Sequence, residues 1–336
     1  MYYVLQFIPY IFNKCFKFLI EKKIVLGKGL VLKSAGSWYT VKTENGEQIS
    51  CAIRGKLRVK EIKSTNPVTV GDYVDYELSK EEGVGVITRI HDRKNYIIRK
   101  SINLSKQVHI IAANIDYLLL MATIRQPETT TMFIDRILVT AEAYRIPAII
   151  IFNKVDILND DELELLEGYE YIYELAGYKT IRTSAITGLN IDEVKGLIKD
   201  KVAVIAGHSG VGKSSLINAI DPELTIKTKE ISVSYKTGKH TTTFSEMHEL
   251  PFGGYIIDTP GIKAFGIIDI EKNELFHFFP EIFRESKNCQ YYNCTHTHEP
   301  KCAVKEAVKQ GVIHEMRYYN YLEIYYDEED KYRKPH

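Results

Sequence analysis

The residues with the clearest chemical potential form one short loop in the middle of the chain. An apolar run at 202–206 precedes this loop, and a helix-compatible stretch at 215–220 follows it. The loop fits the pattern G-x-x-x-x-G-K-[ST] and comprises Gly207, His208, Ser209, Gly210, Val211, Gly212, Lys213, Ser214 and then Ser215. In this strand–loop–helix context backbone N–H groups wrap phosphates, Lys213 adds positive charge and Ser214 offers a hydroxyl to Mg²⁺. The loop predicts a nucleotide phosphate site.

A second polar loop indicates which base the nucleotide carries. Asn153, Lys154, Val155 and Asp156 directly follow an apolar run that ends at Phe152. The Asp156 carboxylate can accept both N1–H and the exocyclic amino group of guanine, a pair of donors that adenine lacks. Asn153 can reach the base or the loop backbone, and the stem of Lys154 can cover the base face.

The residues Ser184 and Ala185 extend this prediction. They follow another short strand and fit a loop whose backbone contacts guanine O6. Together with the phosphate loop, these residues predict binding of GTP and GDP. A phosphate-loop kinase or ATPase is the alternative, against which Asp156 argues.

Two later segments resemble the segments of GTP-binding proteins that contact the γ-phosphate and its Mg²⁺. Asp258 can bind Mg²⁺ through water, and the N–H of Gly261 can contact the γ-phosphate. Upstream, the polar loop 238–243 offers Thr243, or else Thr242, to complete the Mg²⁺ shell. We expect movement here to reach the segments that follow in the chain.

The hydrolytic step lacks one expected side chain. Ile262 stands where Ras-type enzymes keep a glutamine that positions water, and an aliphatic side chain cannot do this. Slow intrinsic hydrolysis is therefore expected. His240, beside the threonines of the polar loop, is the first candidate for activating water, and His208 is the second. Lys213 and Thr243 complete the predicted catalytic set.

A cluster of soft ligands lies near the C-terminus. Cys289, Cys294, His296 and Cys302 supply three thiolates and one imidazole, a set that suits one tetrahedral, structural Zn²⁺. His298 competes with His296 for the fourth position, and ordinary free cysteines are the alternative. A site filled by four protein ligands leaves no open position for catalysis.

The first third of the chain has the two-residue period of strands. Asn45-Gly46 is a hairpin signal. Five short strands are expected, at 28–33, 37–42, 48–53, 73–77 and 85–90. This pattern predicts a barrel of OB type, although an SH3-like barrel would give a similar sequence.

Basic residues gather in the same region. Arg54, Lys56 and Arg58 surround a glycine and form a candidate clamp for RNA phosphates, and Arg93 extends the cluster. A solvated face of a β domain is the alternative.

From residue 108 strands and helices alternate. Helices are expected at 132–144, 161–176 and 191–199, between the buried strands 117–122, 147–152, 179–182 and 202–206. Such alternation predicts a mostly parallel sheet with helices on both faces. An antiparallel pair at 244–250 and 254–257 and a helix at 303–325 complete the expected elements. The base loop precedes the phosphate loop, whereas Ras-like proteins have the opposite order, so the pattern indicates a circular permutation.

Length and composition set broad limits. A chain of 336 residues predicts two or three domains. Its 44 basic and 44 acidic residues balance, so any RNA contact must come from local patches.

Five cysteines, an odd number, favour a reducing compartment, which we take to be the cytoplasm. Residues 1–20 are apolar but interrupted by Lys14 and Lys17, so we expect no membrane span there. Two interpretations of this segment remain open: an amphipathic helix on a membrane surface, or a leader without a role.

These features together resemble the ribosome small-subunit-dependent GTPase family (RsgA/YjeQ). The resemblance rests on the permuted order, the Gly-Lys-His-Thr-Thr-Thr loop, the 258–262 segment, and Cys294-Thr295-His296 ahead of 299–304. It covers roughly residues 24–326. Two departures stand out: the leader is not part of the family pattern, and His208 takes a position where the family usually has an amide side chain.

The resemblance implies a multidomain protein. Its parts would be an OB-fold RNA-binding domain at 24–106, a circularly permuted α/β GTPase domain at 107–270 and a mainly α zinc-binding domain at 271–336. The leader of unknown role at 1–23 lies outside the resemblance. It also implies late maturation of the small (30S) ribosomal subunit, contact with its 16S rRNA, and GTP hydrolysis stimulated by that subunit. We expect a monomer. An RNA-binding scaffold with vestigial hydrolysis is the competing function.

Overall fold

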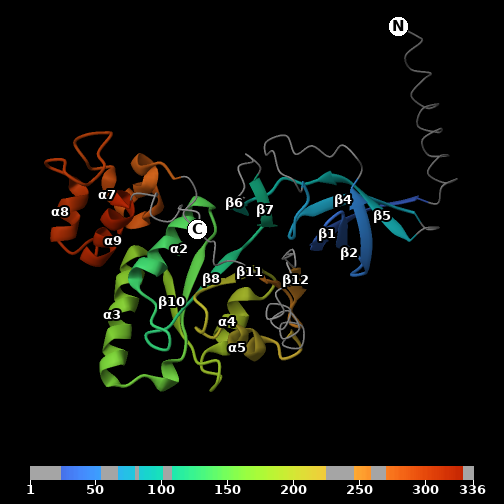
Figure 1. Cartoon of the computed structure of the whole chain (residues 1–336), viewed down its shortest axis with the longest axis horizontal. Coiled ribbons are helices and arrows are strands. Elements are labelled where there is room, and N and C mark those ends of the chain that lie inside the picture. Colours follow the sequence, from blue (N-terminus) through green and yellow to red (C-terminus); the bar gives the residue numbers. More distant parts are fainter. Residues whose placement is uncertain are drawn as a thin grey trace, which may run out of the picture. The chain divides into compact units, whose positions relative to one another are not determined.

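The computed structural model describes residues 24–53, 67–79, 83–100, 108–224, 246–258 and 270–327 (Figure 1). The described residues up to Asn114 form one compact unit with short segments at 246–248 and 257–258, and the others form a second unit. Within the described ranges, no helix combines the length and apolar character needed to cross a bilayer.

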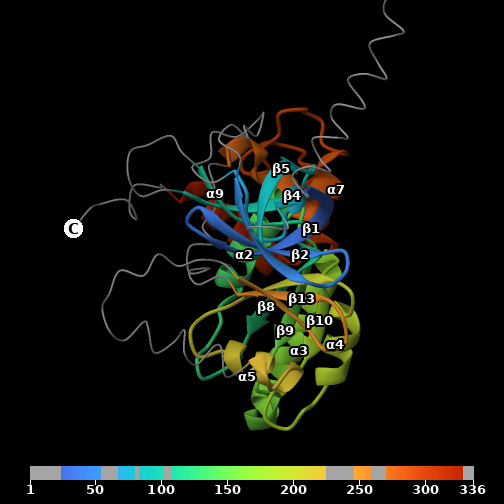
Figure 2. The ribbon, with the colours of Figure 1, turned by 90° about the vertical axis from the view of Figure 1, so that its right-hand side faces the viewer.

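The first unit is a five-stranded barrel. Its strands are β1 (Ile24–Ala35), β2 (Trp38–Thr43), β3 (Gln48–Ile53), β4 (Tyr73–Ser79) and β5 (Val84–Ile90). The hydrogen-bonded order is β1-β2-β3-β5-β4, and β4 returns to pair with β1 from Ser79 to Tyr73 (Figure 2). Alternate residues such as Val31, Val41 and Ile87 fill the interior. This closed order confirms the predicted OB-type barrel.

A hairpin that the sequence analysis did not predict follows the barrel. β6 (Tyr96–Lys100) and β7 (Val108–Ala113) pair antiparallel. Arg93 joins the start of this hairpin to the barrel, because its Nε and Nη2 donate to the buried Asp72 carboxylate at 2.6 and 2.7 Å. Asn114 adds a bond from Nδ2 to Gly71 O at 2.8 Å. Arg93 is therefore a structural cation, and not part of a free phosphate-binding cluster.

The second unit is built on a parallel sheet. The order of its parallel strands in space is β10 (Lys179–Arg182), β9 (Ala148–Phe152), β8 (Tyr117–Ala122) and β11 (Val202–Ala206). The carboxyl ends of parallel strands meet at one edge, so the loops after β8, β9, β10 and β11 all gather there.

Helices cover both faces of this sheet, as predicted. They are α2 (Thr131–Ala143), α3 (Asp160–Ala176), α4 (Ile191–Ile198) and α5 (Lys213–Ile220). Leu119 and Ile205 pack with α4 and α5 in one core cluster. Phe152, whose position in its strand points to the other face, lies 6.2 Å from the ring of Tyr169 on α3.

β12 (Glu246–Glu249) and β13 (Tyr255–Asp258) form the predicted antiparallel pair. Their turn closes with a bond from Leu250 N to Gly254 O at 2.9 Å. Gly254 has a φ of +91°, which only glycine adopts without strain.

The C-terminal module, residues 270–327, is mainly helical. It contains η4 (Lys272–Phe278), α7 (Pro280–Ser286), α8 (Ala303–Lys309) and α9 (Glu315–Tyr326). The prediction of a single helix at 303–325 is wrong, because α8 and α9 are separate helices. Gly311 has a φ of +73° and its N–H donates to Val308 O, so the chain leaves the helix there and starts again at Glu315.

The module packs on α2, inside the second unit. Val139 of α2 is fully buried in the same apolar cluster as Phe279, Ile282 and Tyr321. The spacing of Ile134, Leu138 and Ala141 places these three residues on one buried face of α2. Both that face and the Val139 face are covered, which explains why most of α2 is buried.

A buried ionic group joins the module to α2, and we name it the Arg317 cluster. Arg317, only 1% exposed, donates from Nη1 to Asp135 Oδ1 at 2.6 Å and from Nε to Glu281 Oε1 at 2.6 Å. Asn320 Nδ2 donates to the second oxygen of Asp135 at 2.7 Å, and the Phe279 ring lies 4.6 Å from the guanidinium. Burial alone would lower the pKa of Arg317, but Asp135 and Glu281 raise it well above its usual value.

We predict that Arg317→Ala lowers the free energy of unfolding by about 3–5 kcal/mol, because it leaves two buried carboxylates without their cation. The control is Arg136→Ala, which removes a partly exposed pair between α2 and Asp327 at the end of α9 and should cost about 0–1 kcal/mol. Urea unfolding followed by circular dichroism measures both. Equal stability of the two variants would refute the structural role of the cluster.

Candidate functional site

The phosphate loop connects β11 to α5 and packs closely on its neighbours. Gly207 and Gly212 have φ values of +146° and +96°. A Cβ at Gly207 would lie 2.5 Å from Met121 O, and one at Gly212 would lie 2.4 Å from Asn153 Nδ2. Both the conformation and the close approach therefore require glycine.

The cation of the loop is held by the loop itself. Lys213 Nζ donates to the carbonyl oxygens of Gly207 and His208 at 2.8 and 2.6 Å. Ser209, Gly210, Ser214 and Ser215 are exposed. An anion can therefore approach the start of α5, where backbone N–H groups and the helix dipole attract negative charge.

Asn153 joins three loops at the edge of the sheet. Its Nδ2 donates to Val211 O of the phosphate loop at 2.8 Å. Its Oδ1 accepts from Ala185 N and from Thr183 Oγ1, both at 3.2 Å. Of the two contacts that the sequence analysis considered for Asn153, the structure shows the one to the loop backbone. This buried amide holds the base loop, the Ser184-Ala185 loop and the phosphate loop together.

The remaining residues of the base loop are more open. Lys154 has a φ of +66° and its Nζ donates to Gln126 O. Val155 begins the short helix η1 (Val155–Ile157), in which Asp156 is exposed. Ser184 is buried and its Oγ accepts from Thr187 N at 3.1 Å, which shapes the adjacent loop. The exposed carboxylate of Asp156 can thus accept hydrogen bonds from a ligand.

One contact of the phosphate loop was missed by the sequence analysis. The ring of His208 stacks on Phe133 of α2, with 3.5 Å between the centroids and 26° between the planes. Burial, and then the positive charge of Lys213, lower the pKa of His208. No pattern in the sequence pairs these residues, because a lone Phe at the start of a helix normally indicates core packing.

Some of the predicted site residues are not among those that the structure describes. His240, Thr243 and Gly261 lie outside the described residues, and so does the basic group Arg54, Lys56 and Arg58. Asp258 is the last residue of β13, and only its backbone is described.

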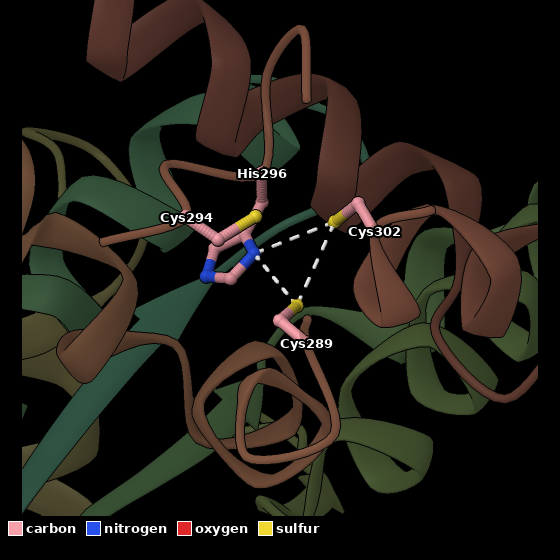
Figure 3. Close-up of side chains that lie close together, drawn as sticks. All are labelled: Cys289, Cys294, His296 and Cys302. Atoms are coloured by element: carbon pink, nitrogen blue, oxygen red, sulfur yellow. Dashed lines mark hydrogen bonds between the residues drawn. The ribbon is translucent and has the colours of Figure 1, made fainter. Parts of the chain in front are cut away.

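The second candidate site lies in the C-terminal module, where Cys289, Cys294, His296 and Cys302 converge (Figure 3). Their ligand atoms lie within 4.8 Å of one another. The Cys289 and Cys302 sulfurs are 3.9 Å apart, and His296 Nδ1 lies 3.6 and 3.5 Å from them. A tetrahedral ion with bonds of about 2.3 Å to sulfur and about 2.0 Å to nitrogen separates such atoms by about 3.8 and 3.5 Å. The arrangement therefore fits a four-coordinate metal.

Protonation favours the same interpretation. Burial raises the pKa of the Cys294 thiol to about 12 and lowers the pKa of His296 to about 4. A neutral imidazole is the form that binds a metal, and a cation at the centre would stabilise thiolates that burial otherwise disfavours.

The loop around His296 is shaped by a residue that the sequence analysis missed. Glu299 accepts from Thr295 N and Oγ1 at 2.7 and 2.6 Å and from Thr297 N at 3.0 Å. Burial alone would raise the pKa of Glu299, but these bonds lower it to about 2. His298 is exposed and bonds to Thr297 Oγ1, so His296 and not His298 faces the three sulfurs.

We predict that the purified chain carries about one equivalent of a divalent metal and that Cys294→Ser or Cys302→Ser removes it. Two matched controls should retain the metal: Cys51→Ser, at a buried thiol of the barrel, and His298→Ala. Mass spectrometry of metals in the dialysed proteins measures the content. Full metal content in the Cys294 and Cys302 variants, or its loss in His298→Ala, would contradict the assignment.

Comparison with known proteins agrees with this architecture. Residues 28–87 match the family described as the RsgA N-terminal domain, and residues 90–268 match the family described as RsgA GTPase. A protein of Flavobacterium psychrophilum named small ribosomal subunit biogenesis GTPase RsgA is 54% identical over 91% of this chain and 94% of its own length. A protein of the same name from Bacteroides fragilis is 55% identical over 91% of this chain and 99% of its own.

Solved structures give the same result. YjeQ from Thermotoga maritima matches 90% of this chain and 98% of its own length, with 38% identity and a TM-score of 0.76. YloQ, described as a circularly permuted GTPase, matches 93% and 97%, with 33% identity and a TM-score of 0.73. The permuted order is the one seen here, where the loop after β9 precedes the loop after β11 in the chain. This protein belongs to the RsgA family of circularly permuted GTPases.

Proposed function

We propose that this GTPase acts in late maturation of the small (30S) ribosomal subunit, contacts the 16S rRNA of that subunit, and is stimulated by it. The observation that carries the proposal is the 54% identity, along 91% of the chain, to a protein named for biogenesis of that subunit. Free cysteines in the described part of the chain fit a reducing compartment, and we infer action in the cytoplasm as a monomer.

In this proposal the edge of the sheet binds guanine nucleotide. The residues 207–215 wrap the phosphates, with Lys213 at the β/γ position. Asp156 accepts hydrogen bonds from guanine, Lys154 covers the base, and the Ser184-Ala185 loop borders it. The bonds from Asn153 to Val211 and Ala185 support this arrangement, because they hold the phosphate-binding and base-binding loops at a fixed spacing.

Magnesium would bind beside the phosphates and neutralise their developing charge during hydrolysis. Ser214, exposed in the first turn of α5, is placed to offer its hydroxyl. Thr243 and Asp258 are the other proposed ligands. Ile262 cannot orient water, so we assign that task to His240 and expect the subunit to complete the site.

The barrel and the metal cluster supply the remaining parts. The barrel exposes Trp38 and Tyr73, each about half accessible, and aromatic rings of this kind stack on unpaired bases. Arg54, Lys56 and Arg58 are proposed to clamp RNA phosphates. Three thiols and one imidazole, with ligand atoms within 4.8 Å of one another, support a structural Zn²⁺.

The central prediction concerns turnover. Purified small subunits should raise the GTP hydrolysis rate well above that of the isolated chain, and the stimulation should fall steeply with salt, because phosphate contacts release counterions. Lys213→Ala should lower the stimulated rate by about 100-fold or more. Phosphate release measured with and without subunits, over a range of salt concentrations, tests both statements.

An unchanged rate in the presence of subunits would rule out the proposed stimulation. The competing function, a scaffold with vestigial hydrolysis, predicts another outcome. In that case Lys213→Ala would support subunit maturation in cells as well as the wild-type chain does.

Base selection gives an independent prediction. Asp156→Asn reverses one hydrogen-bond direction, so it should weaken GDP binding by about 10- to 100-fold and improve binding of xanthosine diphosphate. Asp192→Asn is the matched control, because the Asp192 side chain is 99% exposed on α4. Titration with fluorescent nucleotides measures both affinities. Unaltered guanine preference in Asp156→Asn would remove this residue from the base site.

A further inference from the structure

Helix α2 contacts the phosphate loop and the C-terminal module through residues only two positions apart. The ring of Phe133 stacks on His208 of the phosphate loop, with 3.5 Å between the centroids. The carboxylate of Asp135 accepts from Arg317 of the C-terminal module at 2.6 Å. A helix is stiff over such a short span, so a displacement at one contact is transmitted to the other.

The start of α2 is held firmly. Thr130 caps the helix, and its Oγ1 accepts from the N–H of Phe133 itself at 3.3 Å. Tyr173 of α3 donates to Thr131 O at 3.2 Å. The position of Phe133 is therefore set by the protein scaffold and not by the loop on which its ring stacks.

The stack acts on the peptide that holds the loop cation. The carbonyl of His208 accepts from Lys213 Nζ at 2.6 Å. Because the Phe133 ring restrains the His208 side chain, it also restrains this carbonyl and with it the amine that reaches the phosphates. Without a fixed ring to stack on, the His208 side chain would not restrain this carbonyl.

We propose that Phe133 is a positioning residue for the phosphate loop, and that through it α2 couples nucleotide binding to the C-terminal module. The inference rests on the proposed binding of guanine nucleotide at this loop. Because coupling between two sites is reciprocal, nucleotide at the loop should also stabilise the contact of α2 with the module.

The stack is tested by a double-mutant cycle on the full chain. Phe133→Leu and His208→Gln each remove one ring, and each should weaken binding of fluorescent GDP by about 2- to 12-fold, the range for a single aromatic pair. The double variant should bind no more weakly than the weaker single variant. Phe133→Tyr keeps the ring and should bind like the wild type.

The control and the second measurement address coupling. Phe283→Leu makes the same truncation at a ring of α7 whose partners are Phe276, His277 and Lys287, and it should leave GDP affinity unchanged. In the wild-type chain, GDP should slow amide hydrogen exchange in residues 315–326. In Phe133→Leu saturated with GDP, this protection should be lost.

Three results would overturn the inference while leaving the proposed function intact. They are wild-type affinity in Phe133→Leu, independent and multiplying effects of Phe133→Leu and His208→Gln, and unchanged GDP-dependent protection in saturated Phe133→Leu. Failure of the wild-type chain to bind GDP would instead refute the proposed nucleotide site itself.

Discussion

The second unit depends on the buried ion pairs that the guanidinium of Arg317 makes with Asp135 and Glu281. Bringing a cation out of water is costly unless its hydrogen bonds and its charge are matched. Here Asp135 and Glu281 supply both, and Asn320 and Phe279 complete the surroundings. Because Asp135 belongs to α2 and the other partners belong to the C-terminal module, the two cannot separate without leaving unpaired charges in an apolar interior.

This constraint changes how a nucleotide signal can travel. The order of the motifs along the chain predicts that movement at Gly261 displaces the segments that follow it. The Arg317 cluster limits that movement, because the module can move only with α2 or after the cluster has broken. Since α2 also touches the phosphate loop at His208, a second route from the nucleotide to the module runs through the helix, without passing through residues 259–269.

Much of this architecture could be predicted from local patterns. The barrel strands, the helix predicted at 132–144 and the loops around Asn153 and Lys213 follow from periodicity and motif spacing, which depend on neighbouring residues. The Arg317–Asp135 pair could not be predicted, because 182 positions separate its members and Asp135 resembles an ordinary polar residue on a helix. The β6–β7 hairpin was missed, and the helix predicted at 303–325 proved to be two because the conformation of Gly311 decides where it breaks.

The most direct test of the central claim is native-state hydrogen exchange of the full chain at increasing denaturant. If the Arg317 cluster makes α2 and α9 one cooperative body, their slowest amides should share a single opening free energy. Arg317→Met should then lower the protection of both helices together. Separate values in the wild-type chain, with α9 opening well below α2, would contradict the account.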